Sequence, residues 1–149
     1  YRGYGGKATP DPEWNVVCDI PAIRAVFAAP WDIAIAPLDT CGVLQLSGDR
    51  YNRVAQSDNI LAKTVIANYT GWVHRKHYKD DQSSILFDTQ AAYMCMDDSL
   101  LDMQTVKLRI DDKGNTVPDE QNGRPVQCAL NWKDRDAFEE TLVHALTGN

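Results

Sequence analysis

The sequence predicts an α/β domain, and three features carry that prediction. An amphipathic helix pattern at residues 21–28 is followed by a short apolar run, residues 33–38, which is long enough for a buried strand and too short for a helix. Longer helical patterns lie at residues 59–75 and 88–96. Residues 104–130 contain runs that alternate apolar and polar side chains, as half-exposed strands do. We therefore expect a mostly parallel sheet with a small antiparallel segment near 104–130.

The composition is that of a soluble globular domain. The chain has 149 residues, of which 44% are hydrophobic and 24% are charged, enough for one domain with a buried core. The formal net charge of −6 argues against a nucleic-acid partner. No apolar run reaches the roughly 18 residues of a membrane span, so no membrane association is expected. The chain begins at Tyr1 and not at a methionine, and we expect it to be a fragment.

Local patterns predict where the helices begin and end. Residues 1–18 are rich in glycine and proline and are expected to form a loop. Asp19 is the expected N-cap of the first helix, with Pro21 in its first turn. A short helix is expected from 47 to 53. Asp134 is expected to start a final helix that ends near Gly148.

The other elements follow from periodicity and turn composition. The helix at 59–75 is expected to be capped by Asp58. Residues 112–115 have the composition of a hairpin turn between strands. The side chains expected to form the apolar stripe of the 59–75 helix are Ile60, Leu61, Val65, Ile66, Tyr69 and Val73.

The first candidate site is the triplet Glu13-Trp14-Asn15. It places a carboxylate, an indole and a carboxamide ahead of a helix start, where unpaired backbone donors favour a hydroxyl-rich or anionic ligand. The alternative is a surface turn that caps a helix. Residues from the rest of the chain have to decide between the two.

Two further acidic positions have alternative interpretations. Asp39 and Thr40 follow the predicted buried strand, at the sheet edge where α/β proteins bind ligands, but they could equally turn the chain. Asp88 opens an otherwise apolar helix after Phe87 and is expected to lie against the core, where a carboxylate needs a cation or several donors. The alternative is an N-cap.

Cysteine and histidine give no independent site. The four cysteines have no metal-ligand spacing and are expected to be reduced and structural. His74 and His77 could share a helix face, but without a third ligand we interpret them as solvated residues at a helix end. Common nucleophile, phosphate-binding and zinc motifs are absent.

Four motifs in order resemble the C-terminal half of an inosine-uridine type nucleoside hydrolase. These are Glu13-Trp14-Asn15, Cys18 to Ala22, Ile35 to Thr40, and Leu86-Phe87-Asp88 at a helix start. The resemblance covers nearly all of the chain and implies the corresponding part of a Rossmann-like fold. It also implies that the full-length protein hydrolyses the N-glycosidic bond of ribonucleosides with Ca²⁺ as cofactor.

The resemblance assigns roles to five residues. Glu13 and Asn15 match residues that bind the ribose hydroxyls, and Trp14 and Phe87 would contact the substrate. Asp88 matches the C-terminal aspartate that ligates the catalytic calcium, which prefers hard oxygen ligands. The leaving-group acid of the best-known family members is a histidine at the position of Phe87, and a phenyl ring cannot donate a proton.

The larger departure is that the family's N-terminal aspartate cluster has no match in these 149 residues. We therefore expect the N-terminal metal-binding half, including the catalytic base, to be missing and the isolated chain to be inactive. Its exposed apolar surface is expected to meet the missing half or to drive self-association.

Two other functions remain open from the sequence. One is a degenerate ribose-binding or structural relative without catalysis. The other is a metal-free glycosidase that uses Glu13 and a second carboxylate.

Overall fold

The computed structural model describes residues 11–72 and 74–148, which divide into two compact units. The first unit comprises the chain up to Val43 together with Phe87–Lys133, and the second comprises Leu44–Leu86 and the C-terminal segment from Asp134. Two parts of the sequence analysis, residues 1–10 and Val73, lie outside the described residues. None of the helices in the described ranges is long and apolar enough to cross a membrane.

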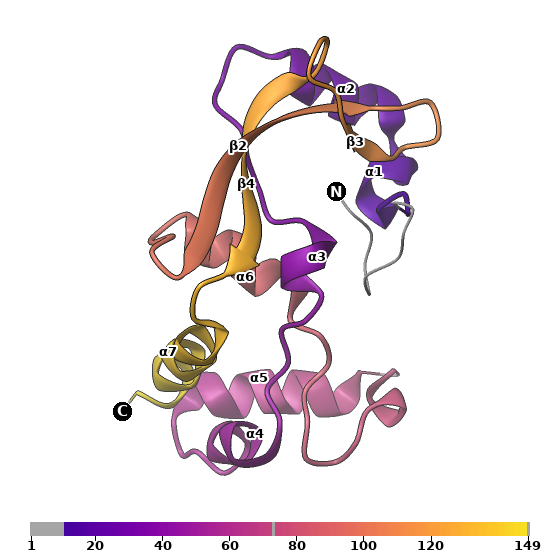
Figure 1. Cartoon of the computed structure of the whole chain (residues 1–149). Coiled ribbons are helices and arrows are strands. Elements are labelled where there is room, and N and C mark those ends of the chain that lie inside the picture. Colours follow the sequence, from indigo (N-terminus) through magenta and orange to yellow (C-terminus); the bar gives the residue numbers. More distant parts are fainter. Residues whose placement is uncertain (1–10, 73, 149) are drawn as a thin grey trace. The chain divides into compact units, whose positions relative to one another are not determined.

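The first unit is built on a four-stranded sheet with the order β1-β4-β2-β3 (Figure 1). Its strands are β1 (Ala34–Ile35), β2 (Leu101–Ile110), β3 (Thr116–Pro118) and β4 (Arg124–Trp132). The β1–β4 pairing is parallel, and the β4–β2 and β2–β3 pairings are antiparallel. The α/β fold class is confirmed, and the antiparallel strands extend beyond the expected boundaries to residues 101 and 132.

In the described part of the first unit, four helices accompany this sheet. They are α1 (Trp14–Cys18), α2 (Ile20–Ala28), α3 (Leu38–Cys41) and α6 (Phe87–Met94). Helix α2 contacts β2, while α3 packs against both β4 and α6. The core of this unit includes the fully buried side chains of Leu101, Leu108 and Cys128.

The ends of α1 and α2 follow from capping and from contacts with the β2–β3 turn. The Asp19 carboxylate accepts a hydrogen bond from Ala22 N at 2.9 Å, so the predicted cap is confirmed. The loop predicted for residues 1–18 is wrong for residues 14–18. These residues form the short helix α1, and Glu13 caps it. Gly114 in the β2–β3 turn has φ +82°, and Val17 of α1 packs against it so closely that a Cβ there would lie 2.7 Å from Val17 Cγ1.

The second unit is a group of helices. It contains α4 (Gly48–Ala55), α5 (Ile60–Gly71), the 3₁₀ helix η2 (Arg75–His77) and α7 (Arg135–Thr147). Its core cluster consists of Leu46, Tyr51, Val54, Ala62 and Val143. The predicted final helix is confirmed, with Asp134 as N-cap and Gly148 in a left-handed C-cap at φ +77°.

Ion pairs join α4 to α7 in this unit. Arg50 donates to Glu139 at 2.6 Å and to Glu140 at 2.8 Å. Hydrogen bonds from Arg50 to Glu140 and Asp136, together with the charge of Glu139, raise the pKa of Arg50 above its ordinary value, so the guanidinium stays charged. Burial raises the pKa of Glu139, although Arg135 and Arg50 oppose that rise.

Helix α5 differs from its prediction in its length, in its N-cap residue and in the face that packs on the core. It ends at Gly71, and Asn59, not Asp58, accepts the capping hydrogen bond from Leu61 N. Ala62 is buried and Ile66 and Tyr69 pack on the core, but Ile60, Leu61 and Val65 are exposed. The predicted stripe is therefore wrong for these three residues.

Candidate functional site

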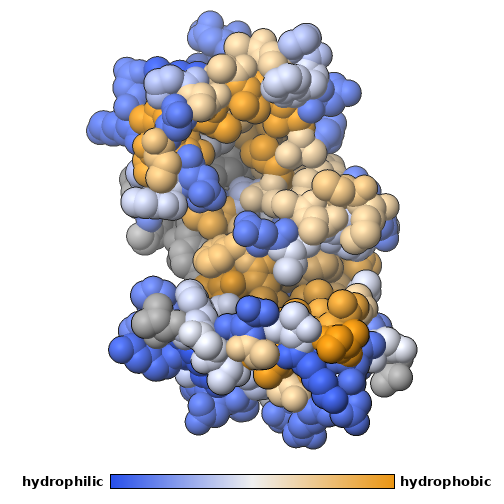
Figure 2. Space-filling view, turned by 180° about the vertical axis from the view of Figure 1, so that it is seen from behind, coloured by the Kyte–Doolittle hydropathy of each residue, from blue (hydrophilic) through white to orange (hydrophobic). Residues whose placement is uncertain are grey.

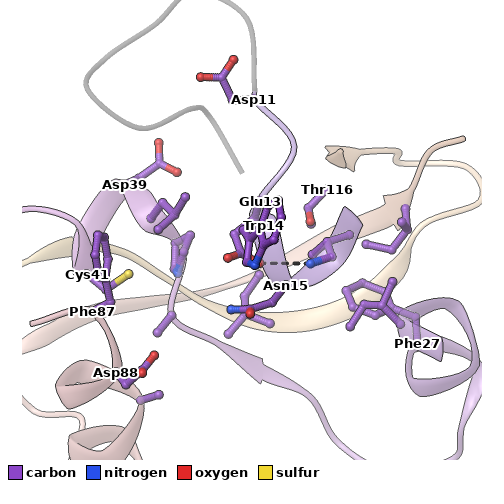
Figure 3. Close-up of a pocket in the computed structure, with 18 residues that line it drawn as sticks. Asp11, Glu13, Trp14, Asn15, Phe27, Asp39, Cys41, Phe87, Asp88 and Thr116 are labelled. Carbon is purple, nitrogen blue, oxygen red and sulfur yellow. Dashed lines mark hydrogen bonds between the residues drawn. The ribbon is translucent and has the colours of Figure 1, made fainter. Parts of the chain in front are cut away.

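A cavity of about 650 Å³ lies in the first unit (Figure 3). Two segments far apart in the sequence supply most of its predicted site residues: the N-terminal end of α1 and the N-terminal end of α6. Among the described residues, those that line the cavity are Asp11, Glu13, Trp14, Asn15, Val16, Ile23, Phe27, Ile35, Ala36, Pro37, Leu38, Asp39, Cys41, Phe87, Asp88, Ala91, Ile110 and Thr116. All five predicted substrate and metal residues are among them.

The triplet lies at the start of α1. Glu13 is half-buried, and its Oε2 accepts a hydrogen bond from Val16 N at 3.2 Å, shown as the dashed line in Figure 3. The capping interpretation therefore applies to Glu13, although it caps α1 and not α2, and the same side chain lines the cavity. Trp14 is 74% exposed and does not pack into the core.

Asp39 and Thr40 have different environments although they are neighbours in α3. Asp39 lines the cavity and lies in the first turn of α3, which begins just past β1. Thr40 is buried, and its hydroxyl lies 3.2 Å from both Pro37 O and Ala129 O. Of the two residues predicted at the strand end, Asp39 therefore lines the cavity, whereas Thr40 forms hydrogen bonds inside the fold.

Phe87 and Asp88 occupy the first two positions of α6, and both line the cavity. The expectation that Asp88 lies against the core is wrong, because the residue is exposed. Asp88 belongs to the first turn, where a carboxylate is favoured by the helix dipole. Phe87 is 40% exposed, which leaves ring surface accessible from the cavity.

Negative charge is concentrated around Cys41. Burial raises the pKa of this thiol to about 11, and the charges of Asp88, Glu13 and Asp39 contribute to the rise. The thiol is therefore protonated at neutral pH and is a poor nucleophile. A cavity that collects carboxylates in this way favours a cation or the hydroxyl groups of a sugar.

The described residues do not complete a metal site by themselves. Within residues 11–72 and 74–148 no group of three His, Cys, Asp or Glu side chains is arranged to hold a metal ion. Asp88 has the hard oxygen chemistry that Ca²⁺ prefers, but calcium takes about 6 to 8 oxygen ligands. Most ligands of any calcium at this cavity would have to come from elsewhere.

Several cavity residues were not predicted as site residues. Ile23 and Phe27 line the cavity from α2. Cys41 and Thr116 come from α3 and β3, and no local sequence pattern connects them to the other two segments. None of the four cysteines, all of which lie in the described residues, forms a disulfide; Cys41 and Cys128 are buried, and Cys18 and Cys95 are exposed.

Comparison with known proteins defines the family. Residues 2–140 match the family described as inosine-uridine preferring nucleoside hydrolase. The chain belongs to this family. A search of curated proteins gave no significant match.

A solved plant nucleoside hydrolase, the enzyme PpNRh1, shares the fold of this family member. The two structures align with a TM-score of 0.78 and 22% sequence identity over 96% of this chain. The alignment covers 50% of the plant enzyme, so the chain spans about half of that protein's length. At this identity the match establishes the fold alone.

Proposed function

We propose that this chain is the C-terminal part of a calcium-dependent enzyme that hydrolyses the N-glycosidic bond of ribonucleosides. The observation that carries the proposal is the cavity, which gathers Glu13, Asn15, Phe87 and Asp88 in a member of the nucleoside hydrolase family. The N-terminal half of the protein would supply the remaining metal ligands and the catalytic base. The isolated chain would therefore be inactive.

The cavity residues have distinct roles in this proposal. Glu13 and Asn15 would hydrogen-bond the ribose hydroxyls, since a carboxylate accepts and a carboxamide both donates and accepts. The bond from Val16 N fixes the Glu13 carboxylate while leaving lone pairs for a sugar hydroxyl. Asp88 would be one calcium ligand, and Trp14 and Phe87 would contact the substrate. When bound, calcium would hold the ribose diol and lower the pKa of the attacking water.

A non-catalytic nucleoside-binding relative is the second candidate. Phe87 favours it, because a phenyl ring can stack on a base but cannot protonate a leaving group. The two candidates make the same prediction for ribose binding and opposite predictions for ribose release. Activity that persists in a chelator would instead favour the metal-free glycosidase.

The test uses the full-length protein with inosine and uridine as substrates. We expect ribose release that stops in a calcium chelator and returns when calcium is added. Asp88→Asn should weaken calcium binding at least about 10-fold by isothermal titration, because a ligand carboxylate becomes a neutral amide. Asp112→Asn, an exposed position outside the cavity, is the matched control and should bind calcium normally. Unchanged calcium binding by Asp88→Asn would contradict the metal assignment.

Partner binding is proposed for the exposed apolar surface. Figure 2 shows hydrophobic groups in patches among hydrophilic ones on the visible face. Ile60, Leu61 and Val65 project from α5, and Leu61 and Val65 lie one helical turn apart. Such surface would be covered by the N-terminal half of the protein or by a second copy of the chain.

A further inference from the structure

A buried polar pair joins α3 and α6, two of the helices that contribute lining residues to the cavity. Gln90 of α6 donates from Nε2 to the Thr40 hydroxyl of α3 at 2.9 Å. Both side chains are buried, and Gln90 is fully so. Asp39 and Cys41 flank Thr40 in the sequence and line the cavity, while Asp88 precedes Gln90 by two residues.

Thr40 connects this pair to the sheet. Its hydroxyl can donate to Ala129 O of β4 at 3.2 Å or to Pro37 O at the same distance. Its backbone carbonyl accepts from Trp132 Nε1 at 3.0 Å. Thr40 therefore ties α3 and α6 to β4 through directional bonds inside the core of the first unit.

The pair is not an arrangement that stability alone would favour. In the described part of the chain, the buried Oε1 of Gln90 has no hydrogen-bond partner. A buried acceptor without a partner destabilises the folded state, whereas an apolar side chain of similar size would carry no such penalty. Unlike apolar contacts, however, a hydrogen bond constrains the direction in which a side chain approaches its partner. The pair can thus fix the rotation and height of α6 against α3.

We propose that Gln90 and Thr40 are positioning residues that hold the first turn of α6, and with it Phe87 and Asp88, against the cavity. The inference rests on the proposed function only for the substrate contacts of Phe87 and Asp88. The geometric part concerns α6 itself and holds for the protein without any ligand.

The test replaces both polar groups together, with Thr40→Val and Gln90→Leu in the full-length protein. Exchanging two bonded partners for apolar groups of similar shape is nearly neutral for stability, so this variant should unfold near the wild-type temperature. Without ligand or calcium, amide hydrogen exchange in α6 should become about fivefold faster. The kcat/KM for inosine should fall about 10-fold, because Phe87 and Asp88 are displaced from their productive positions. The single variant Thr40→Ser retains the hydroxyl and is the control; it should show wild-type amide exchange in α6 and wild-type kcat/KM.

The outcomes separate this inference from the proposed function. Unchanged α6 exchange in a folded double variant would overturn the positioning role and leave the pair as core packing. A full-length protein that hydrolyses no nucleoside would refute the proposed function, while α6 exchange would still decide the positioning role. If the double variant does not fold, Gln90→Met removes the amide alone, and the same measurements decide the question.

Discussion

At the scale of single residues, Glu13 combines a structural and a ligand-facing position. Its carboxylate caps α1 through the bond from Val16 N and also lines the cavity. A fixed carboxylate loses less rotamer freedom when a ligand binds, so preorganisation follows from the capping bond. Asn15 belongs to the first turn of the same helix and is positioned by the same cap.

Phe87 provides the residue-scale prediction. In the full-length protein, Phe87→Ala should raise the KM for inosine about 10-fold, because stacking of a base on an aromatic ring contributes about 1–3 kcal/mol. The kcat should change much less, since a phenyl ring transfers no proton. Steady-state kinetics measure both, and Phe87→Tyr is the control that keeps the ring. A KM unchanged by Phe87→Ala would show that the ring does not contact the substrate.

At the scale of elements, local patterns predicted those helices whose ends are set by their own side chains. Asp19 and Asp134 cap α2 and α7 as expected, since capping depends on residues within one turn. Helix α1 was not predicted, because it has only five residues and packs against Gly114 of a distant turn. The predicted apolar stripe of α5 was wrong because apolar residues occur on two faces of this helix. The face that packs on the core carries the small Ala62.

Gly114 provides the element-scale prediction. Gly114→Ala should reduce the free energy of unfolding by about 1–3 kcal/mol, because φ +82° strains an alanine and its Cβ would lie 2.7 Å from Val17 Cγ1. Urea unfolding of the 149-residue chain measures this change. Gly71→Ala is the matched control, since nothing lies within 4 Å of a Cβ there, and it should be neutral or slightly stabilising. Equal unfolding midpoints for the two variants would refute the contact between the turn and α1.

At the scale of the whole molecule, the sequence motifs identified parts of the cavity but not its complete outline. Glu13 to Asn15 and Phe87-Asp88 could be found because each is a contiguous motif with a family resemblance. Cys41, Thr116 and Phe27 reach the same cavity from three other elements, and only the folded chain brings them together. The exposure of Asp88 was also not predictable, because apolar neighbours in sequence do not determine which face of α6 is covered.

The exposed face of α5 provides the prediction for the whole chain. Ile60 is 73% and Leu61 55% exposed, and apolar surface of this kind commonly drives association. Sedimentation velocity of the 149-residue chain should therefore show a sedimentation coefficient that rises with protein concentration. Replacing Leu61 and Val65 together by glutamine, which preserves helix propensity, should shift the chain toward monomer. Met96→Gln is the control and should leave the association unchanged. Met96 is 82% exposed but lies in the first unit, away from α5 in the sequence. Single exposed apolar residues are common in monomers. A wild-type chain that stays monomeric at high concentration would contradict self-association through this face.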